Sequence, residues 1–209
     1  ENVASIFNNL CKGSSASSRE YRMYLAQLGC IEKLFQLLER SLNGHITAKL
    51  RFHCAQCLQY ISIEEDLRTR VGAKSHISII LQVIYNINNG HSVKGELFGI
   101  LMNLAANETN AKRILNEDGL HLIKQSLNCR PSEDISIGSY ACGLVANIAA
   151  VQSLKMKVCR AGILTQLHKI CKTQEDLLLL VNAVTAIKNV VHESSACAKM
   201  CAKTGGVAA

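Results

Sequence analysis

Cysteine and histidine are the side chains in this sequence that could bind a metal or act as a nucleophile. The closest cysteine pair is Cys54-Ala55-Gln56-Cys57, with His53 directly before it. A structural zinc site needs a second cysteine pair or a histidine pair at suitable spacing, and none follows this one. We therefore expect no metal at this pair and no cofactor elsewhere in the chain.

The ten cysteines mostly lie among Leu, Ile and Ala, where a free cysteine behaves as a small core residue. A chain of 209 residues can bury an ample core without disulfides, so we expect a reducing, intracellular location. The cytoplasm is the expected compartment, and the cytoskeleton, the cilium and the nucleus stay open as alternatives.

The sequence contains no recognisable catalytic motif. His168 and Cys171 share a helix face, but a third partner for them does not stand out. The chain has no GxSxG or HExxH motif and no glycine-rich phosphate loop, which are the patterns that mark the common hydrolases and nucleotide-binding enzymes. We therefore expect a protein that is not an enzyme.

The composition predicts the elements that position these residues. The sequence is 48% hydrophobic and 4% aromatic, with one proline and no tryptophan, which favours an all-α chain over a β-sandwich or barrel. The net charge is +7, but the charges are spread evenly, without a basic tail or an arginine-rich run. We therefore expect no nucleic-acid partner. No apolar run is long enough for membrane insertion.

A short phrase with a central asparagine recurs along the sequence. Copies centred on Asn9, Asn103, Asn147 and Asn189 are completed by a degenerate copy centred on Tyr60. A second phrase, in which glycine precedes an apolar residue, recurs out of phase with the first. It comprises Gly29-Cys30-Ile31, a weak Ser75-His76-Ile77, Asp118-Gly119-Leu120, Ala161-Gly162-Ile163 and Gly205-Gly206-Val207. Both phrases give a period of about 43 residues, which indicates a repeat protein.

Each period predicts three helices. Apolar residues at i, i+3, i+4 and i+7 mark the second helix, and a shorter, more polar helix precedes it. These apolar sets are Ile31, Leu34, Phe35 and Leu38; Ile77, Ile80, Leu81 and Ile84; Leu120, Ile123 and Leu127; and Ile163, Leu167 and Ile170. A third, longer helix carries the asparagine and turns Ile100 and Leu101 toward the core.

Turns and caps separate these helices. Turn residues stand at Asn43-Gly44, Asn88-Asn89-Gly90 and Arg130-Pro131-Ser132, because Gly, Asn and Pro favour turn geometry. The segments 132–134 and 173–176 are typical of helix N-caps with an acidic first turn.

Three helices per period, with a glycine between the first and the second, resemble armadillo repeats. The resemblance is carried best by residues 100–127, ILMNLAANETNAKRILNEDGLHLIKQSL, and 144–170, LVANIAAVQSLKMKVCRAGILTQLHKI. It implies an all-α, right-handed superhelical solenoid over residues 1–209, as part of a longer array. The expected units are a partial repeat at 1–13, repeats at about 14–62, 63–105, 106–150 and 151–192, and a partial repeat at 193–209. HEAT repeats are the neighbouring alternative, but two-helix units do not explain the glycine register.

The resemblance also implies where a partner binds. Armadillo proteins bind extended peptides or partner helices on the concave face lined by the third helices, where an asparagine carboxamide holds the peptide backbone. Residues four and seven before each asparagine share its face. The predicted peptide- or partner-binding residues are Asn9, His53, Gln56, Tyr60, Glu96, Gly99, Asn103, Tyr140, Gly143, Asn147, Asn182, Thr185 and Asn189.

Two alternatives stay open for these residues. Each asparagine either contacts a ligand or satisfies local backbone groups. Gly99 and Gly143 either admit a peptide backbone or allow tight packing between helices, at a cost of about 1 kcal/mol each against alanine.

The composition of this face separates the classes of partner. Nuclear-import adaptors of the armadillo family carry tryptophan four residues before the asparagine, and catenin-type grooves carry rows of Lys and Arg. The corresponding residues here are Ser5, Gln56, Gly99, Gly143 and Thr185. This face therefore has neither the tryptophans that hold a lysine-rich signal nor the basic rows that hold an acidic ligand. A separate basic cluster, Lys155, Lys157 and Arg160, has two interpretations: a solvated helix face, which is favoured, or a surface for an acidic partner.

We therefore predict a non-catalytic protein–protein interaction scaffold that holds an extended peptide or a partner helix in the concave groove of an armadillo array. The alternatives are a structural or docking element of a cytoskeletal or ciliary assembly and, less favoured, a nuclear-transport adaptor.

Overall fold

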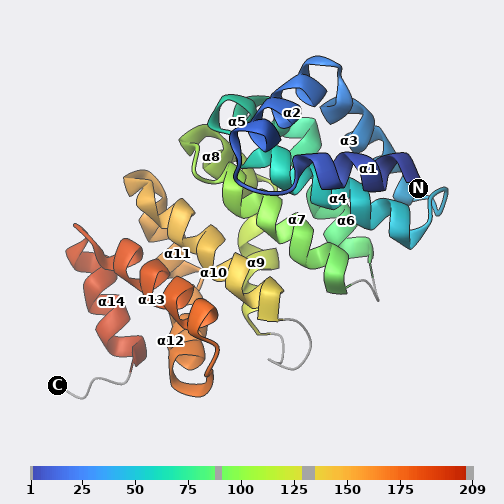
Figure 1. Cartoon of the computed structure of the whole chain (residues 1–209). Coiled ribbons are helices and arrows are strands. Elements are labelled where there is room, and N and C mark those ends of the chain that lie inside the picture. Colours follow the sequence, from blue (N-terminus) through green and yellow to red (C-terminus); the bar gives the residue numbers. More distant parts are fainter. Residues whose placement is uncertain (1, 88–90, 129–134, 206–209) are drawn as a thin grey trace. The chain divides into compact units, whose positions relative to one another are not determined.

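The computed structural model describes residues 2–87, 91–128 and 135–205 (Figure 1). Within these ranges the regular elements are all helices and no strand occurs, which confirms the all-α prediction. The chain divides into two compact units, Glu1–Asn110 and Ala111–Ala209, named here unit 1 and unit 2. The predicted turns at 88–90 and 130–132, the cap at 132–134 and the last glycine phrase from 206 onward lie outside the described residues.

The helices follow one another in groups of three. Unit 1 contains α1 (Asn2–Cys11), α2 (Ala16–Gln27), α3 (Cys30–Ser41), α4 (Ala48–Ser62), α5 (Glu65–Val71), α6 (Lys74–Asn86) and α7 (His91–Leu104). Helix α8 (Glu108–Asn116) crosses the unit boundary. Unit 2 continues with α9 (Gly119–Leu127), α10 (Ile135–Ala150), the short 3-10 helix η1 (Gln152–Leu154), α11 (Lys155–Arg160), α12 (Ile163–Thr173), α13 (Leu177–Val191) and α14 (Ser195–Gly205). The repeat limits given above stay a prediction.

A residue in the left-handed conformation separates the first helix from the second in three groups. Gly29 (φ 78°) and Gly162 (φ 75°) hold this position as predicted, but in the third group it is Asp118 (φ 67°) and not Gly119. Aspartate tolerates this conformation better than most side chains. Gly119 is needed for another reason, because a Cβ there would lie 2.5 Å from the carbonyl oxygen of Ile114.

The weak second copy of the glycine phrase is not a helix junction. Ser75, His76 and Ile77 lie inside α6, and the junction between α5 and α6 falls at Gly72 and Ala73. The ring of His76 instead stacks on Phe35 of α3, with 3.9 Å between the ring centroids. The sequence pattern therefore identified the second helix but misplaced its start.

The second helices provide most of the core, as their apolar spacing predicts. In α3, α6 and α12 the predicted apolar residues are buried. In α9, Gly119, Ile123 and Leu127 are buried, whereas Leu120 is only half-buried. The predicted cap at 173–176 is confirmed by Asp176, whose Oδ1 accepts a hydrogen bond from the Leu179 N–H at 2.8 Å.

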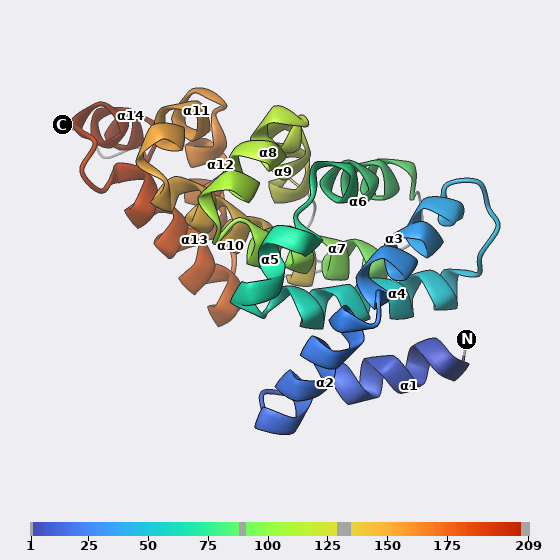
Figure 2. The same cartoon turned by 90° about the horizontal axis from the view of Figure 1, so that it is seen from above.

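The third helices lie side by side within each unit. Helix α4 packs between α1 and α7 in unit 1, and α10 packs against α13 in unit 2 (Figures 1 and 2). Ile100 and Leu101 of α7 are fully buried, as their position two and three residues before Asn103 predicts. This packing sets the spacing between the predicted binding residues of one unit.

A buried ion pair fixes the first helix group in unit 1. Arg22 of α2 and Glu64, which precedes α5, are 3% and 7% exposed, and their side chains approach to 2.6 Å. Arg22 also donates to the carbonyl oxygens of Cys11 and Gly13 at 2.7 and 2.8 Å. The guanidinium thus joins the end of α1 to α2 and to the junction between α4 and α5.

No single helix among the described residues is both long and apolar enough to cross a membrane. The segments Ile135–Ala150 and Gln152–Arg160 reach the length and apolar content of a membrane span only when they are taken together, and the chain bends by 110° between them.

Candidate partner-binding faces on the third helices

The predicted binding residues of unit 1, named here the unit 1 ladder face, lie on α1, α4 and α7. Its members are Asn9, His53, Gln56, Tyr60, Glu96, Gly99 and Asn103. Asn9 is exposed and Gly99 is buried, while the other five are half-buried.

The carboxamide of Asn103 links two third helices. Its Nδ2 donates to the backbone oxygen of Gln59 at 3.3 Å and to Ser62 Oγ at 3.0 Å, both on α4. With both amide hydrogens directed at α4, Oδ1 is the atom that this side chain can offer to a ligand N–H. The two alternatives for the asparagines are therefore compatible at Asn103. Its amide nitrogen donates to groups of α4, and its oxygen can accept a hydrogen bond from a ligand.

Gln56 connects all three third helices of unit 1. Its Oε1 accepts from Asn8 Nδ2 of α1 at 2.6 Å, and its Nε2 donates to Glu96 Oε1 of α7 at 3.2 Å. Asn8 was not among the predicted binding residues. It is buried, and its Oδ1 lacks a hydrogen-bond partner among the described residues. Glu96, the single acidic residue of the face, is thereby already engaged by Gln56.

Gly99 lies against the Gln59 side chain of α4. A Cβ at this position would lie 2.1 Å from Nε2 of the Gln59 side chain. The glycine therefore makes room for the packing of α4 against α7.

His53 lies beside two buried cysteines on α4. Both ring nitrogens of His53 are buried without a hydrogen-bond partner, and its ring lies 5.8 Å from that of Phe52. Cys54 and Cys57 are buried in the core, and burial raises the pKa of Cys54 to about 11. Among the described residues, no group of three or more His, Cys, Asp and Glu side chains is placed to hold a metal ion.

The predicted binding residues of unit 2, named here the unit 2 ladder face, lie on α10 and α13. They are Tyr140, Gly143, Asn147, Asn182, Thr185 and Asn189. Gly143 is buried, Thr185 is exposed and the others are half-buried. As in unit 1, most residues of this face are partly covered by a neighbouring helix and partly open to solvent.

The asparagines of α13 repeat the pattern of Asn103. Asn182 Nδ2 donates to the backbone oxygen and to Oγ of Ser139 at 3.2 and 2.8 Å, and Asn189 Nδ2 donates to the backbone oxygen of Ala146 at 2.9 Å. Thr185 instead bonds within its own helix, to the oxygen of Val181 at 2.7 Å. The amide nitrogens thus hold α13 against α10.

The basic cluster on α11 is smaller than the sequence suggested. Lys155 is buried, and its Nζ donates to the carbonyl oxygen of His192 at the end of α13. Lys157 and Arg160 are exposed. Lys155 is therefore a link between helices and not part of a surface for an acidic partner.

His168 has partners that the sequence did not reveal. Its Nε2 lies 3.4 Å from Cys201 Sγ and its Nδ1 lies 3.3 Å from Thr204 Oγ1, both on α14. Burial lowers the pKa of His168, assisted by Lys172, and burial raises the pKa of Cys201. Both shifts favour the neutral thiol and the neutral imidazole, which is the opposite of an activated thiolate.

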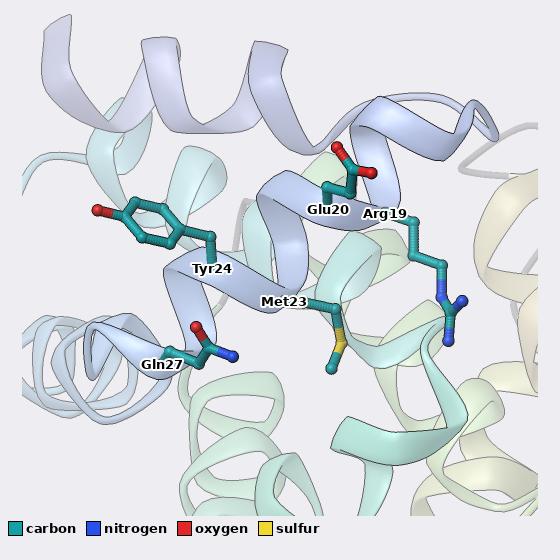
Figure 3. A pocket seen from close by; sticks show the side chains of 5 residues that line it. All are labelled: Arg19, Glu20, Met23, Tyr24 and Gln27. Carbon is teal, nitrogen blue, oxygen red and sulfur yellow. The ribbon is translucent and has the colours of Figure 1, made fainter.

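A shallow hollow of about 330 Å³ lies on α2 (Figure 3). Its five lining side chains come from this one helix: Arg19, Glu20, Met23, Tyr24 and Gln27. Figure 3 shows Glu20 and Tyr24 pointing away from Arg19 and Met23, so these groups do not converge on one point. This arrangement lacks the enclosed shape of a small-molecule site.

Comparison with known proteins identifies the family. The sequence matches the family described as protein zer-1 homolog-like, C-terminal domain, over residues 17–201. The chain belongs to this family. A search of curated proteins finds no match for this zer-1 homolog-like domain.

Solved structures show the fold of the zer-1 homolog-like domain. A designed armadillo repeat protein in complex with the peptide (KR)4 matches 99% of this chain and 81% of its own, with a TM-score of 0.83 and 16% identity. Computationally designed armadillo repeat proteins for modular peptide recognition match 98% and 81%, with a TM-score of 0.82 and 17% identity. An engineered protein matches 98% and 79%, with a TM-score of 0.83 and 20% identity. The zer-1 homolog-like domain is therefore an armadillo-repeat solenoid, which confirms the fold prediction.

Proposed function

We propose that this chain is a non-catalytic protein–protein interaction scaffold that holds an extended peptide or a partner helix on its ladder faces. The observation that carries the proposal is the orientation of the ladder asparagines. Asn103 turns its amide nitrogen toward the neighbouring third helix and keeps Oδ1 for a ligand N–H. Peptide capture by designed armadillo proteins of the same fold supports it.

A peptide library tests this function directly. The purified chain is used to select binders from displayed random decapeptides, and their affinities are measured by fluorescence anisotropy. We expect the double variant Asn103→Ala/Asn147→Ala to weaken the selected peptides at least about tenfold, because each lost hydrogen bond in a desolvated contact contributes on the order of 1 kcal/mol. Asn86→Ala is the control, since Asn86 is exposed on α6 and its amide donates to the oxygen of Gln82 in its own helix.

Unchanged affinity in the double variant would place the contact on another surface and refute the ladder-face proposal. Thermal unfolding of each variant is measured beside binding, because Asn103 also joins α4 to α7. A loss of affinity counts for the proposal only if the variant is folded at the assay temperature.

The proposed ligand is not a basic import signal. The chain has no tryptophan, and Glu96, the acidic residue on the ladder faces, already accepts a hydrogen bond from Gln56. Calorimetry with the (KR)4 peptide should give no measurable heat with this chain, whereas the designed armadillo protein in complex with that peptide serves as the positive control. Measurable heat with this chain would restore the nuclear-transport alternative.

We place this activity inside the cell, in the cytoplasm. The free cysteines Cys11, Cys54, Cys57, Cys142, Cys159 and Cys197 are buried thiols, and free thiols in this number suit a reducing compartment. The proposal includes no nucleic-acid partner and no cofactor. Fractionation of cells that express the tagged chain is the measurement that checks the compartment.

A further inference from the structure

Three sulfur atoms form a row between α11 and α14 in unit 2. The Cys197 thiol of α14 donates to the Met156 sulfur of α11 at 3.4 Å. The Cys159 thiol of α11 hydrogen-bonds in turn to Cys197. Residues at i and i+3 share one side of a helix, so Met156 and Cys159 both lie on the side of α11 that packs against α14. The fold thus brings two thiols from different helices into contact.

Both thiols of this pair are enclosed by protein. Cys159 is 2% exposed and Cys197 is fully buried, and both are free cysteines. Burial, and to a smaller extent the hydrogen bond to Cys197, raises the pKa of Cys159 to about 12. Because the thiolate is the reactive form of cysteine, the pair stays reduced in the compartment proposed above and reacts only under sustained oxidation.

Cys201 offers a different connection to Cys197. It lies four residues later on the same side of α14, and its Sγ lies 3.4 Å from Nε2 of His168 on α12. A disulfide between Cys197 and Cys201 would join two turns of one helix. A disulfide between Cys159 and Cys197 would instead join α11, the first helix of one group of three, to α14, the first helix of the next. Of these two bonds, the second would limit the movement of one helix against another.

We propose that Cys159 and Cys197 form a disulfide when the chain meets hydrogen peroxide, and that this bond holds α14 against α11. One thiol loses its proton and its sulfur attacks the peroxide, giving a sulfenic acid and a first molecule of water. The second thiol attacks this sulfenic sulfur, and a second molecule of water leaves. Two S–H bonds are thereby replaced by one S–S bond, and the two electrons reduce the peroxide. Neither cysteine belongs to a ladder face, so the proposal does not depend on peptide binding.

Peptide mapping by mass spectrometry, after alkylation of the remaining thiols, tests the bond. Trypsin separates the three cysteines, because Cys159 falls in residues 158–160, Cys197 in 189–199 and Cys201 in 200–203. After peroxide treatment we expect peptides 158–160 and 189–199 to be linked, about 2 Da lighter than their sum, and to separate on reduction with dithiothreitol. Cys197→Ala should abolish the link and Cys201→Ala should keep it. Absence of the link at peroxide levels that convert Cys201 to its sulfinic acid, or a link from Cys197 to Cys201 in its place, would overturn the proposal.

Thermal unfolding tests whether the bond holds α14 in place. The oxidised chain should unfold at a midpoint at least about 5 °C above that of the reduced chain, because the bond closes a loop in the unfolded chain and so lowers its entropy. Each variant is compared with its own reduced form. Cys159→Ala should show no rise after peroxide treatment, and Cys201→Ala should show the full one. A linked chain with an unchanged or lower midpoint would mean that the bond strains the packing of α11 on α14, and it would overturn the proposed role.

Discussion

The buried Arg22–Glu64 pair gives the sharpest prediction for stability. The substitution Arg22→Met keeps the apolar stem of the side chain and removes its guanidinium. Glu64, which is 7% exposed, would then keep only Arg19 as a charged partner, at 3.1 Å. The carbonyl oxygens of Cys11 and Gly13 would lose the donors that now lie at 2.7 and 2.8 Å.

Removing one partner of a buried ion pair costs about 3 to 5 kcal/mol where the other charge is left without a buried partner. Arg19 compensates Glu64 only in part, because its side chain is 60% exposed and screened by solvent. We expect Arg22→Met to lower the free energy of unfolding by that amount. The double variant Arg22→Met/Glu64→Gln should recover at least about 1 kcal/mol of the loss, since no unpaired charge remains. Urea denaturation followed by circular dichroism measures these values.

Arg70→Met provides the control for this experiment. Arg70 and Glu32 form a two-fold hydrogen-bonded pair at 2.6 Å, but both side chains are more than 40% exposed. Removing this arginine should cost no more than about 1.5 kcal/mol, including its bond to the Ala26 oxygen. Equal losses for the two arginine variants, or a loss below about 1 kcal/mol for Arg22→Met, would refute the reasoning from burial.

Three further predictions follow from backbone packing, thiol burial and carboxyl titration. Gly119→Ala should destabilise the chain by about 1 to 3 kcal/mol in urea denaturation, because its Cβ would clash with the Ile114 carbonyl oxygen; an unchanged midpoint would contradict this contact. The pKa of Cys54 is raised to about 11. Because the thiolate is the reactive form, Cys54 should react with iodoacetamide at pH 8 about a hundredfold more slowly than an ordinary thiol of pKa 9.0. Mass spectrometry should detect alkylation of the less buried Cys201 first. Hydrogen bonding to Arg70 lowers the pKa of Glu32 in the folded chain. The small contribution of this pair to stability is therefore present above the unfolded pKa of Glu32 and is lost as the pH falls through the lowered folded pKa. A pH series of urea-unfolding midpoints should show this loss, and Glu32→Gln should remove it.

The sequence predicted the features that depend on short-range periodicity. Spacing of i, i+3, i+4 and i+7 identified the buried sides of α3, α6 and α12, and the recurring asparagine identified the third helices. These features are predictable because each helix must bury one continuous side against its neighbours. The match to armadillo repeats confirms the fold that this periodicity implied.

The polar links between helices were not predictable in the same way. Arg22 and Glu64 are 42 residues apart, and each looks like an ordinary surface charge in its own segment. Lys155 was assigned to a surface cluster, but its Nζ bonds to the oxygen of His192, 37 residues away. Such pairs form only because consecutive repeats bring the residues together, and single-helix patterns contain no information about which charges will meet.

The polar residues of the third helices differ in what they contact, and this difference affects how binding experiments are interpreted. Asn103 and Asn189 turn their amide nitrogens toward the preceding third helix, so replacing either one removes a helix contact together with any ligand contact. A lower affinity in such a variant therefore combines two free energies, one of folding and one of binding. Thr185 is exposed and its hydroxyl donates to the Val181 oxygen of its own helix, so its replacement leaves the packing of α13 on α10 intact. Comparing the asparagine variants with a Thr185 variant separates recognition by the ladder face from the stability of the repeat that presents it.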